Sequence, residues 1–286
     1  MTDFTSALGS LPFLRHALAA GLVTAIAAGV VGSLVVTRRM ASAAGGLAHA
    51  VLGGVGLAYW LAQAQGVAWA HPLHGAVVVG VGCALLLAWV EARRHERADT
   101  AIAALWAVGM AAGVLFLART PGYRSDLMGY LLGNVLLVDP ATLRWLIGLD
   151  AVVVLVVWLF REPIIATSFD PEFARLRGVN VDLWSGIVLV LVALTVVSLV
   201  YVVGIVMVIA LLTLPAAAAG HLTRRVGAMM LVAVVVCAVA STGGLVLSWH
   251  WDLPTGAVTV IVAAAIYLLA RVGSGLWHRR RPAGSA

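Results

Sequence analysis

The residue best suited to chemistry in this chain is His49, which stands in a stretch otherwise made of small and aliphatic residues. On a helix, His49 shares a face with Gly45 and Gly53, four residues to either side. The adjoining stripe of small residues consists of Gly46, Ala50, Gly54 and Ala58. Small residues let a second backbone approach closely, so we expect the imidazole in a notch between helices. There it would either hydrogen-bond to a neighbouring helix or act as a transient ligand for zinc or another transition metal in a permeation path.

Two further pairs of residues could contact a cation. His250 and Asp252 lie two residues apart towards the end of the chain, and His71 and His74 lie three apart. A structural zinc site needs four protein ligands, and the sequence shows no such set. We therefore expect no resident metal or other cofactor. His250 and Asp252 are predicted to make transient contacts with a metal at the outer mouth of the path.

Asp150 and Pro215 are two further residues that interrupt apolar stretches. An ionised carboxylate within a membrane helix costs roughly 3 kcal/mol, so we expect Asp150 to pair with a polar group of another helix. Pro215 has no backbone N–H and leaves the carbonyl of Leu211 without its helical partner. The resulting kink is either architectural or a hinge that turns a carbonyl towards the path, as in the broken helices of transporters.

The composition of the whole chain is typical of a protein embedded in lipid. Of 286 residues, 63% are hydrophobic and 10% are charged, with a mean hydropathy of +1.06. About 25% of residues are charged in soluble domains, so the sequence predicts an integral membrane protein in the lipid bilayer. Its arginines lie in short clusters between apolar runs, which is typical of membrane loops and argues against nucleic-acid binding. Cys83 and Cys237 each stand alone and are predicted to be packing residues.

All eighteen basic residues are arginines. The absence of lysine excludes a Walker A loop, which needs GK[ST], and any Schiff-base lysine. The chain is therefore predicted not to be an enzyme, and its energy must come from a partner or from an ion gradient.

The positions of the ionisable residues predict eight or nine membrane spans. A helix needs about 20 apolar residues to cross the hydrocarbon core. Residues 183–220 contain no ionisable side chain, and at about 1.5 Å per residue this run is too long for one span, so we expect two helices that meet at Gly204. Residues 127–138 are too few to cross and predict a re-entrant or interfacial helix. The predicted spans cover residues 17–36, 41–62, 75–90, 101–118, 145–160, the two halves of 183–220, 226–249 and 253–270.

The arginines also predict the orientation of these spans. With the N-terminus outside and nine alternating spans, fourteen arginines fall in inner loops and four in outer loops. This asymmetry follows the positive-inside rule. We expect a multi-pass protein of the bacterial inner membrane, without a cleavable signal peptide.

One inner loop, residues 162–182, is predicted to contain a helix of its own. Asp170 can cap a helix that starts at Pro171, and Gly178 can end it. Phe173 and Leu176 would then lie on one face, with charged residues around them. The helix either lies on the membrane surface or docks against a cytoplasmic partner.

Five segments, taken in order, carry a resemblance to a known family. They are RRMASAAGGLAHAVLGGVGLAY (38–59), DLMGYLLG (126–133), FDPEFARLRGVNV (169–181), VGIVMVIALLTLPAAAA (203–219) and TGGLVLSWHWDLPTGA (242–257). Together they resemble the permease subunits of ABC importers for zinc, manganese and iron, and the resemblance covers nearly the whole chain.

The resemblance implies an all-α type II ABC importer permease, with residues 1–286 forming one transmembrane domain. Two copies would enclose one path, with an ATPase dimer beneath them and an extracytoplasmic metal-binding protein above. The coupling helix would span about residues 170–178, with Asp170, Pro171, Glu172, Phe173, Leu176 and Gly178 facing the ATPase.

One position departs from the family pattern. Many members carry an aspartate four residues before the histidine, where this chain has Gly45.

The alternative functions for the chain are a permease for a metal chelate or a cobalamin-like ligand, and a gradient-driven secondary carrier.

Overall fold

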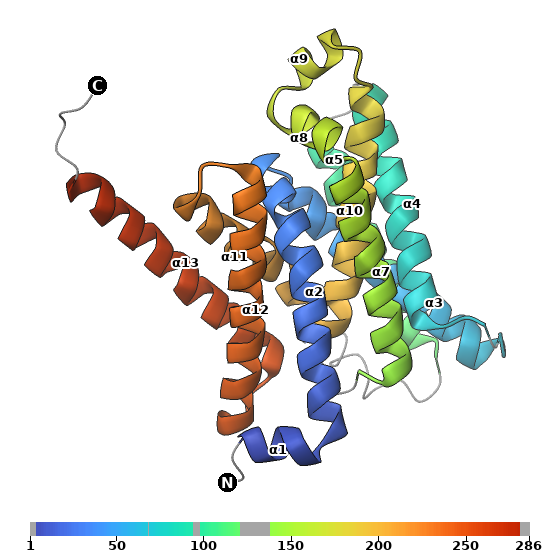
Figure 1. The fold of residues 1–286 in the computed structure, drawn as a ribbon. Coiled ribbons are helices and arrows are strands. Elements are labelled where there is room, and N and C mark those ends of the chain that lie inside the picture. Colours follow the sequence, from blue (N-terminus) through green and yellow to red (C-terminus); the bar gives the residue numbers. More distant parts are fainter. Residues whose placement is uncertain (1–3, 68, 94–97, 121–137, 281–286) are drawn as a thin grey trace.

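The computed structural model describes residues 4–67, 69–93, 98–120 and 138–280, which form helices joined by short connections (Figure 1). Nine of these helices are long and apolar enough to cross a membrane, which confirms the predicted count within the described residues. They are α2 (Pro12–Thr37), α3 (Ala41–Ala64), α4 (Pro72–Arg93), α5 (Ala98–Ala118), α7 (Pro140–Leu159), α10 (Val181–Val203), α11 (Ile205–Leu222), α12 (Val226–Trp251) and α13 (Thr255–Arg280). The predicted re-entrant segment 127–138 lies, except for Val138, outside the described residues.

Three short helices complete the described fold. They are α1 (Phe4–Ser10), α8 (Arg161–Phe169) and α9 (Pro171–Leu176). The sequence predicted α9 but neither α1 nor α8, because both are too short for an apolar periodicity to stand out. In Figure 1, α8 and α9 protrude from one end of the bundle, and α1 lies at the opposite end.

The long apolar run divides at Gly204, as predicted. Gly204 is the single residue between α10 and α11, and its φ of +87° falls in the region that favours glycine. Its neighbours Val203 and Ile205 are buried. Backbone that leaves the helical path in an apolar environment is tolerated where other protein segments cover it.

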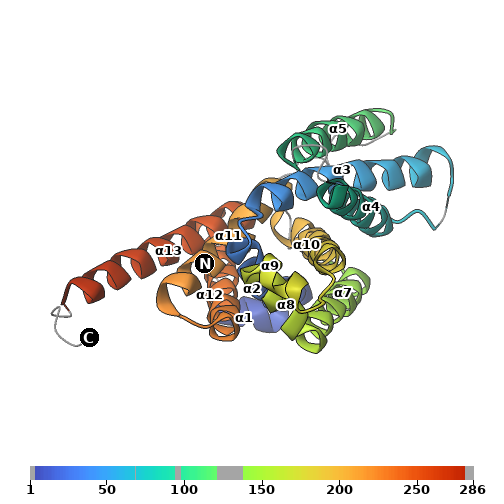
Figure 2. The same ribbon diagram turned by 90° about the horizontal axis from the view of Figure 1, so that it is seen from above.

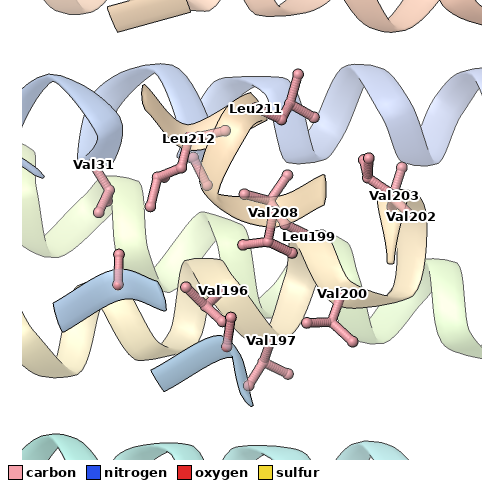
Figure 3. Close-up of a cluster of buried hydrophobic side chains, with 14 of the residues drawn as sticks. Val31, Val196, Val197, Leu199, Val200, Val202, Val203, Val208, Leu211 and Leu212 are labelled. Carbon is pink, nitrogen blue, oxygen red and sulfur yellow. The ribbon is translucent and has the colours of Figure 1, made fainter. Parts of the chain in front are cut away.

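The centre of the bundle is built from branched side chains of α2, α10 and α11. Figure 3 shows Val196, Val197 and Leu199 of α10 close to Val31 of α2 and Val208 of α11. These five side chains are fully buried. With no polar group among them, this cluster holds the three helices together by close packing alone.

Helix α3 is approached closely by α4 on one side and by α5 on another (Figure 2). A Cβ added to Gly54 would lie 2.2 Å from the carbonyl oxygen of Gly75, and a Cβ added to Gly75 would lie 2.2 Å from that of Gly54. A Cβ on Gly109 of α5 would lie 2.4 Å from the Cα of Ala50. The stripe of small residues on α3 is therefore the surface that lets backbones meet, as predicted.

This contact predicts that Gly54→Ala destabilises the protein. The added methyl group would meet the backbone of α4, which cannot move aside as a side chain can, and overpacking of this kind costs about 1–3 kcal/mol. We expect a lower melting temperature for the purified variant in detergent. Gly82→Ala on α4 is the matched control, because its Cβ would meet nothing within 4 Å. Equal melting temperatures for the two variants would contradict the close contact.

Candidate functional site

His49 is buried within α3, with only 7% of its surface exposed. Its Nδ1 lies 2.9 Å from the carbonyl oxygen of Gly45. A carbonyl oxygen can only accept, so Nδ1 is the donor of this hydrogen bond, and Nε2 is the ring nitrogen that a metal ion could contact. The ring stacks on Trp106 of α5, with centroids 4.3 Å apart and planes at 26°. A histidine held in this way by a backbone carbonyl is oriented as metal-binding histidines are.

The position four residues before His49 is filled from another helix. A Cβ on Gly45 would lie 2.8 Å from the Cδ1 of Ile209 on α11 and 3.5 Å from the Cζ3 of Trp106. Ile209 thus occupies the space into which a carboxylate at position 45 would project. Throughout the described ranges, no three His, Cys, Asp or Glu residues come together as a metal cluster. His49 can therefore offer one nitrogen to a passing ion, which suits brief contact rather than storage.

The two predicted outer contacts lie together at the end of α12. His250 is exposed near the end of α12, where its Nδ1 donates to the carbonyl oxygen of Val246 at 2.9 Å. Asp252 follows as the C-cap of α12 with a φ of +52°, and it is also exposed. The structure therefore places His250 and Asp252 at the end of α12, and His49 separately within α3. Their predicted contact with a metal remains a prediction.

His71 and His74 take part in the turn that leads into α4, which begins at Pro72. His71 Nδ1 accepts from the backbone N–H of Leu73 at 3.2 Å, and His74 Nδ1 donates to the carbonyl oxygen of Trp69 at 3.2 Å. The two rings lie 5.8 Å apart. These hydrogen bonds give both residues a structural role at the start of the helix.

Asp150 pairs with another helix, as predicted. Its carboxylate lies on α7 with only 3% of the residue exposed, and its Oδ2 accepts from the hydroxyl of Ser198 on α10 at 2.9 Å. Its Oδ1 has no hydrogen-bond partner among the described residues. This hydrogen bond links α7 to α10 inside the bundle. Breaking it would be costly, because a buried polar group would lose its partner.

Pro215 lies buried within α11, and the helix continues through it. One turn earlier, the carbonyl oxygen of Leu212 faces α2 so closely that a Cβ on Gly32 would lie 2.1 Å from it. This close contact shows that α11 packs tightly against α2 just before Pro215. The role of Pro215 as a hinge remains a prediction.

Helix α9 has the caps that the sequence predicted. The Oδ1 of Asp170 accepts from the N–H of Phe173 at 2.9 Å, Pro171 is the first helical residue, and Gly178 follows the helix with a φ of +80°. Arg175 forms an ion pair of 2.7 Å with Asp182 in the first turn of α10. The helix is thus held at its start by its own cap and near its end by α10.

Large apolar side chains are exposed at the end of α8 and on α9. Leu176 is 86% exposed, Phe169 61% and Phe173 52%, while Asp170 and Glu172 lie exposed nearby. We call Phe169, Phe173 and Leu176 the apolar tip. In Figure 1, α9 stands clear of the bundle. Three large apolar side chains exposed within eight residues, on a protruding part of the chain, favour a protein docking site.

Comparison with known proteins supplies the context for this geometry. Residues 10–274 match the family described as the ABC 3 transport family. An uncharacterized membrane protein from Synechocystis sp. is 39% identical over 90% of this chain and 89% of its own length. The manganese transport system membrane protein MntC from Halalkalibacterium halodurans is 32% identical over 94% of this chain and 90% of its own length.

A solved structure, PsaBC from Streptococcus pneumoniae in complex with Fab, has the same fold. It matches with a TM-score of 0.83 and 28% identity, covering 93% of this chain and 94% of that one. These findings confirm the resemblance to permeases of metal-ion ABC importers and the fold class predicted with it. With nine membrane-length helices, they also support the predicted multi-pass location in the bacterial inner membrane. The chain belongs to the ABC 3 transport family.

Proposed function

We propose that this protein is the transmembrane permease of a binding-protein-dependent ABC importer for divalent transition metal ions, with manganese or zinc as the cargo. The observation that carries the proposal is the similarity to MntC of Halalkalibacterium halodurans over more than nine tenths of the chain. The exposed apolar tip of α9 supports it, because an importer permease must engage an energy-supplying partner from the cytoplasm.

In this proposal, residues 1–286 form a single transmembrane domain and two copies enclose one path. A dimer of cytoplasmic ABC ATPases hydrolyses ATP, so the permease itself is not an enzyme and holds no permanent cofactor. An extracytoplasmic metal-binding protein delivers the ion at the outer mouth, near His250 and Asp252. The ion then meets His49, whose Nε2 gives a brief contact. Pro215 acts as the hinge in the transition between outward and inward states.

The rival proposals are less well supported by the described residues. A gradient-driven carrier needs ionisable groups along its path. Within the described chain, the one buried carboxylate is Asp150, and it is bound to Ser198. A permease for a metal chelate or a cobalamin-like ligand has no observation of its own to favour it.

The proposal is tested by reconstitution. We expect the permease, co-purified with its partner ATPase and metal-binding protein, to take up Mn²⁺ or Zn²⁺ into proteoliposomes when ATP is supplied to the ATPase side. Omitting the ATPase, or using an ATPase that cannot hydrolyse ATP, should stop uptake. Uphill uptake by the permease alone would contradict the proposal, and competition between the two ions would identify the cargo.

A further inference from the structure

Arg38 connects three helices at the end of the bundle that carries α9. It is the C-cap residue of α2, immediately beyond the membrane-spanning part of that helix. Its Nε donates to the Oγ of Ser168 at 2.8 Å, and its Nη2 donates to the Oγ1 of Thr167 at 2.6 Å. Its Nη1 donates to the Oγ of Ser185 at 3.3 Å. Three separate nitrogens of one planar guanidinium thus reach α8 and α10 at once, which a lysine ammonium cannot reproduce.

The charge on Arg38 is kept in a largely buried position. Burial lowers the pKa of Arg38 to about 10, and the negative charge of Glu91 on α4 opposes that change. The guanidinium therefore remains protonated near neutral pH. Hydrogen bonds from a charged group are stronger than those between neutral groups. The neighbouring Arg39 is exposed, so the two adjacent arginines differ in environment.

The partners of Arg38 are themselves held firmly. The hydroxyl of Ser168 donates to the carbonyl oxygen of Ile164 at 2.5 Å, and that of Thr167 donates to the carbonyl oxygen of Pro163 at 2.8 Å. Each hydroxyl thus donates within α8 and accepts from Arg38. Because the backbone of α8 holds both hydroxyl groups in place, they fix the position of Arg38 relative to that helix.

Helix α8 leads directly into α9 through one residue, Asp170, which is also the cap of α9. On its other side, α9 is tied to α10 by the Arg175–Asp182 ion pair, and Ser185 lies in the same first turns of α10. Helices α8, α9 and α10 are therefore joined to one another around the docking surface. Arg38 adds charged hydrogen bonds between this group and α2, whose buried residues also pack against α10 in the core (Figure 3).

We propose that Arg38 is a positioning residue that transmits the movement of α9 to the transmembrane helices α2 and α10. This inference rests on the proposed function, because it assumes that an ATPase moves α9. A displacement of α9 shifts α8, and the hydrogen bonds of Arg38 carry that shift to α2. Without them, the ATPase still binds α9 and hydrolyses ATP, but the path opens less often per hydrolysed nucleotide.

The test compares Arg38→Lys and Arg38→Gln with wild type in proteoliposomes that contain the ATPase and the metal-binding protein. The readout is the number of metal ions taken up per ATP hydrolysed. We expect assembly and ATP hydrolysis to stay within about twofold of wild type, as for changes away from an interface. The transport ratio should fall about tenfold, the effect of losing one hydrogen bond to a charged group. The matched control is Arg39→Gln, which should keep the wild-type ratio.

A merely structural role for Arg38 would lower yield, hydrolysis and uptake together and leave the ratio unchanged, and that result overturns the inference. If the Arg38 variants fail to fold, the pair Thr167→Val and Ser168→Ala removes the hydroxyl partners while keeping the arginine. A normal ratio in that variant would also overturn the inference. Absence of ATP-dependent uptake by wild type would instead contradict the proposed function itself, and the coupling role with it.

Discussion

Leu176→Asp is expected to weaken assembly with the ATPase by about 30-fold or more and to abolish ATP-driven metal uptake, without unfolding the permease. Leu176 is the most exposed part of the apolar tip, with 86% of its surface accessible. Truncation of a central interface residue commonly costs 2 kcal/mol or more, which corresponds to about that loss of affinity. A charge at this point adds the cost of desolvating a carboxylate. Co-purification from detergent and the binding affinity of the solubilised proteins give the measurement.

The fold should tolerate this change because the Leu176 side chain buries little surface when the protein folds. Leu222→Asp at the end of α11 is the control, since Leu222 is also exposed, at 57%, but lies away from α9. Glu172→Arg tests the charged part of the same surface. Asp170→Arg is less informative, because the Asp170 carboxylate caps α9 and its loss would disturb the helix itself. Unchanged assembly of the Leu176→Asp variant would rule out α9 as the docking helix.

His49→Leu is expected to reduce metal uptake by roughly 10- to 100-fold, the range seen when the ligand shell of a metal is disturbed. Leucine keeps an apolar side chain of similar bulk beside Trp106 but removes Nε2, the ring nitrogen that is not held by the carbonyl of Gly45. The ATPase should still assemble and hydrolyse ATP, because His49 lies inside the bundle and away from α9. Uptake of Mn²⁺ and Zn²⁺ at limiting concentration gives the measurement.

Two variants separate a ligand from a packing residue at this site. His221→Leu, at the end of α11 beside Tyr267, removes another imidazole and should leave uptake unchanged. Trp106→Phe keeps an aromatic ring against His49, and we expect uptake to survive with a higher metal requirement. If His49→Leu transports metal normally, His49 is a packing residue and the ion crosses elsewhere. A melting temperature lowered in step with uptake would point to the same conclusion.

Much of the fold could be predicted because it depends on local patterns. The length of each apolar run sets the number of spans, since a helix must be long enough to cross the hydrocarbon core. The division at Gly204 and the caps of α9 follow from residues whose backbone preferences act within one turn. The close contacts of α3 follow from small residues at helical spacing. In each case the relevant residues are near one another in the sequence.

The candidate site was only partly predictable. His49 could be singled out, but not its stacking on Trp106 or the side chain of Ile209 beside Gly45. Ser198 could not be chosen as the partner of Asp150, because the bundle contains several hydroxyls and the two residues are 48 positions apart. Nothing in the local sequence distinguishes Arg38 from Arg39. The packing of α8 and α10 against α2 is what brings Arg38 into contact with both helices.

The sequence alone predicted eight or nine membrane spans, the turn at Gly204, and a capped helix in one of the loops. Those properties depend on the hydrophobicity and backbone preferences of neighbouring residues, which act before distant segments meet. The tertiary structure decided which side chains share a contact: His49 with Trp106, Asp150 with Ser198, and Arg38 with α8 and α10. Such contacts depend on the way in which helices far apart in the chain pack together, and no local pattern encodes that packing.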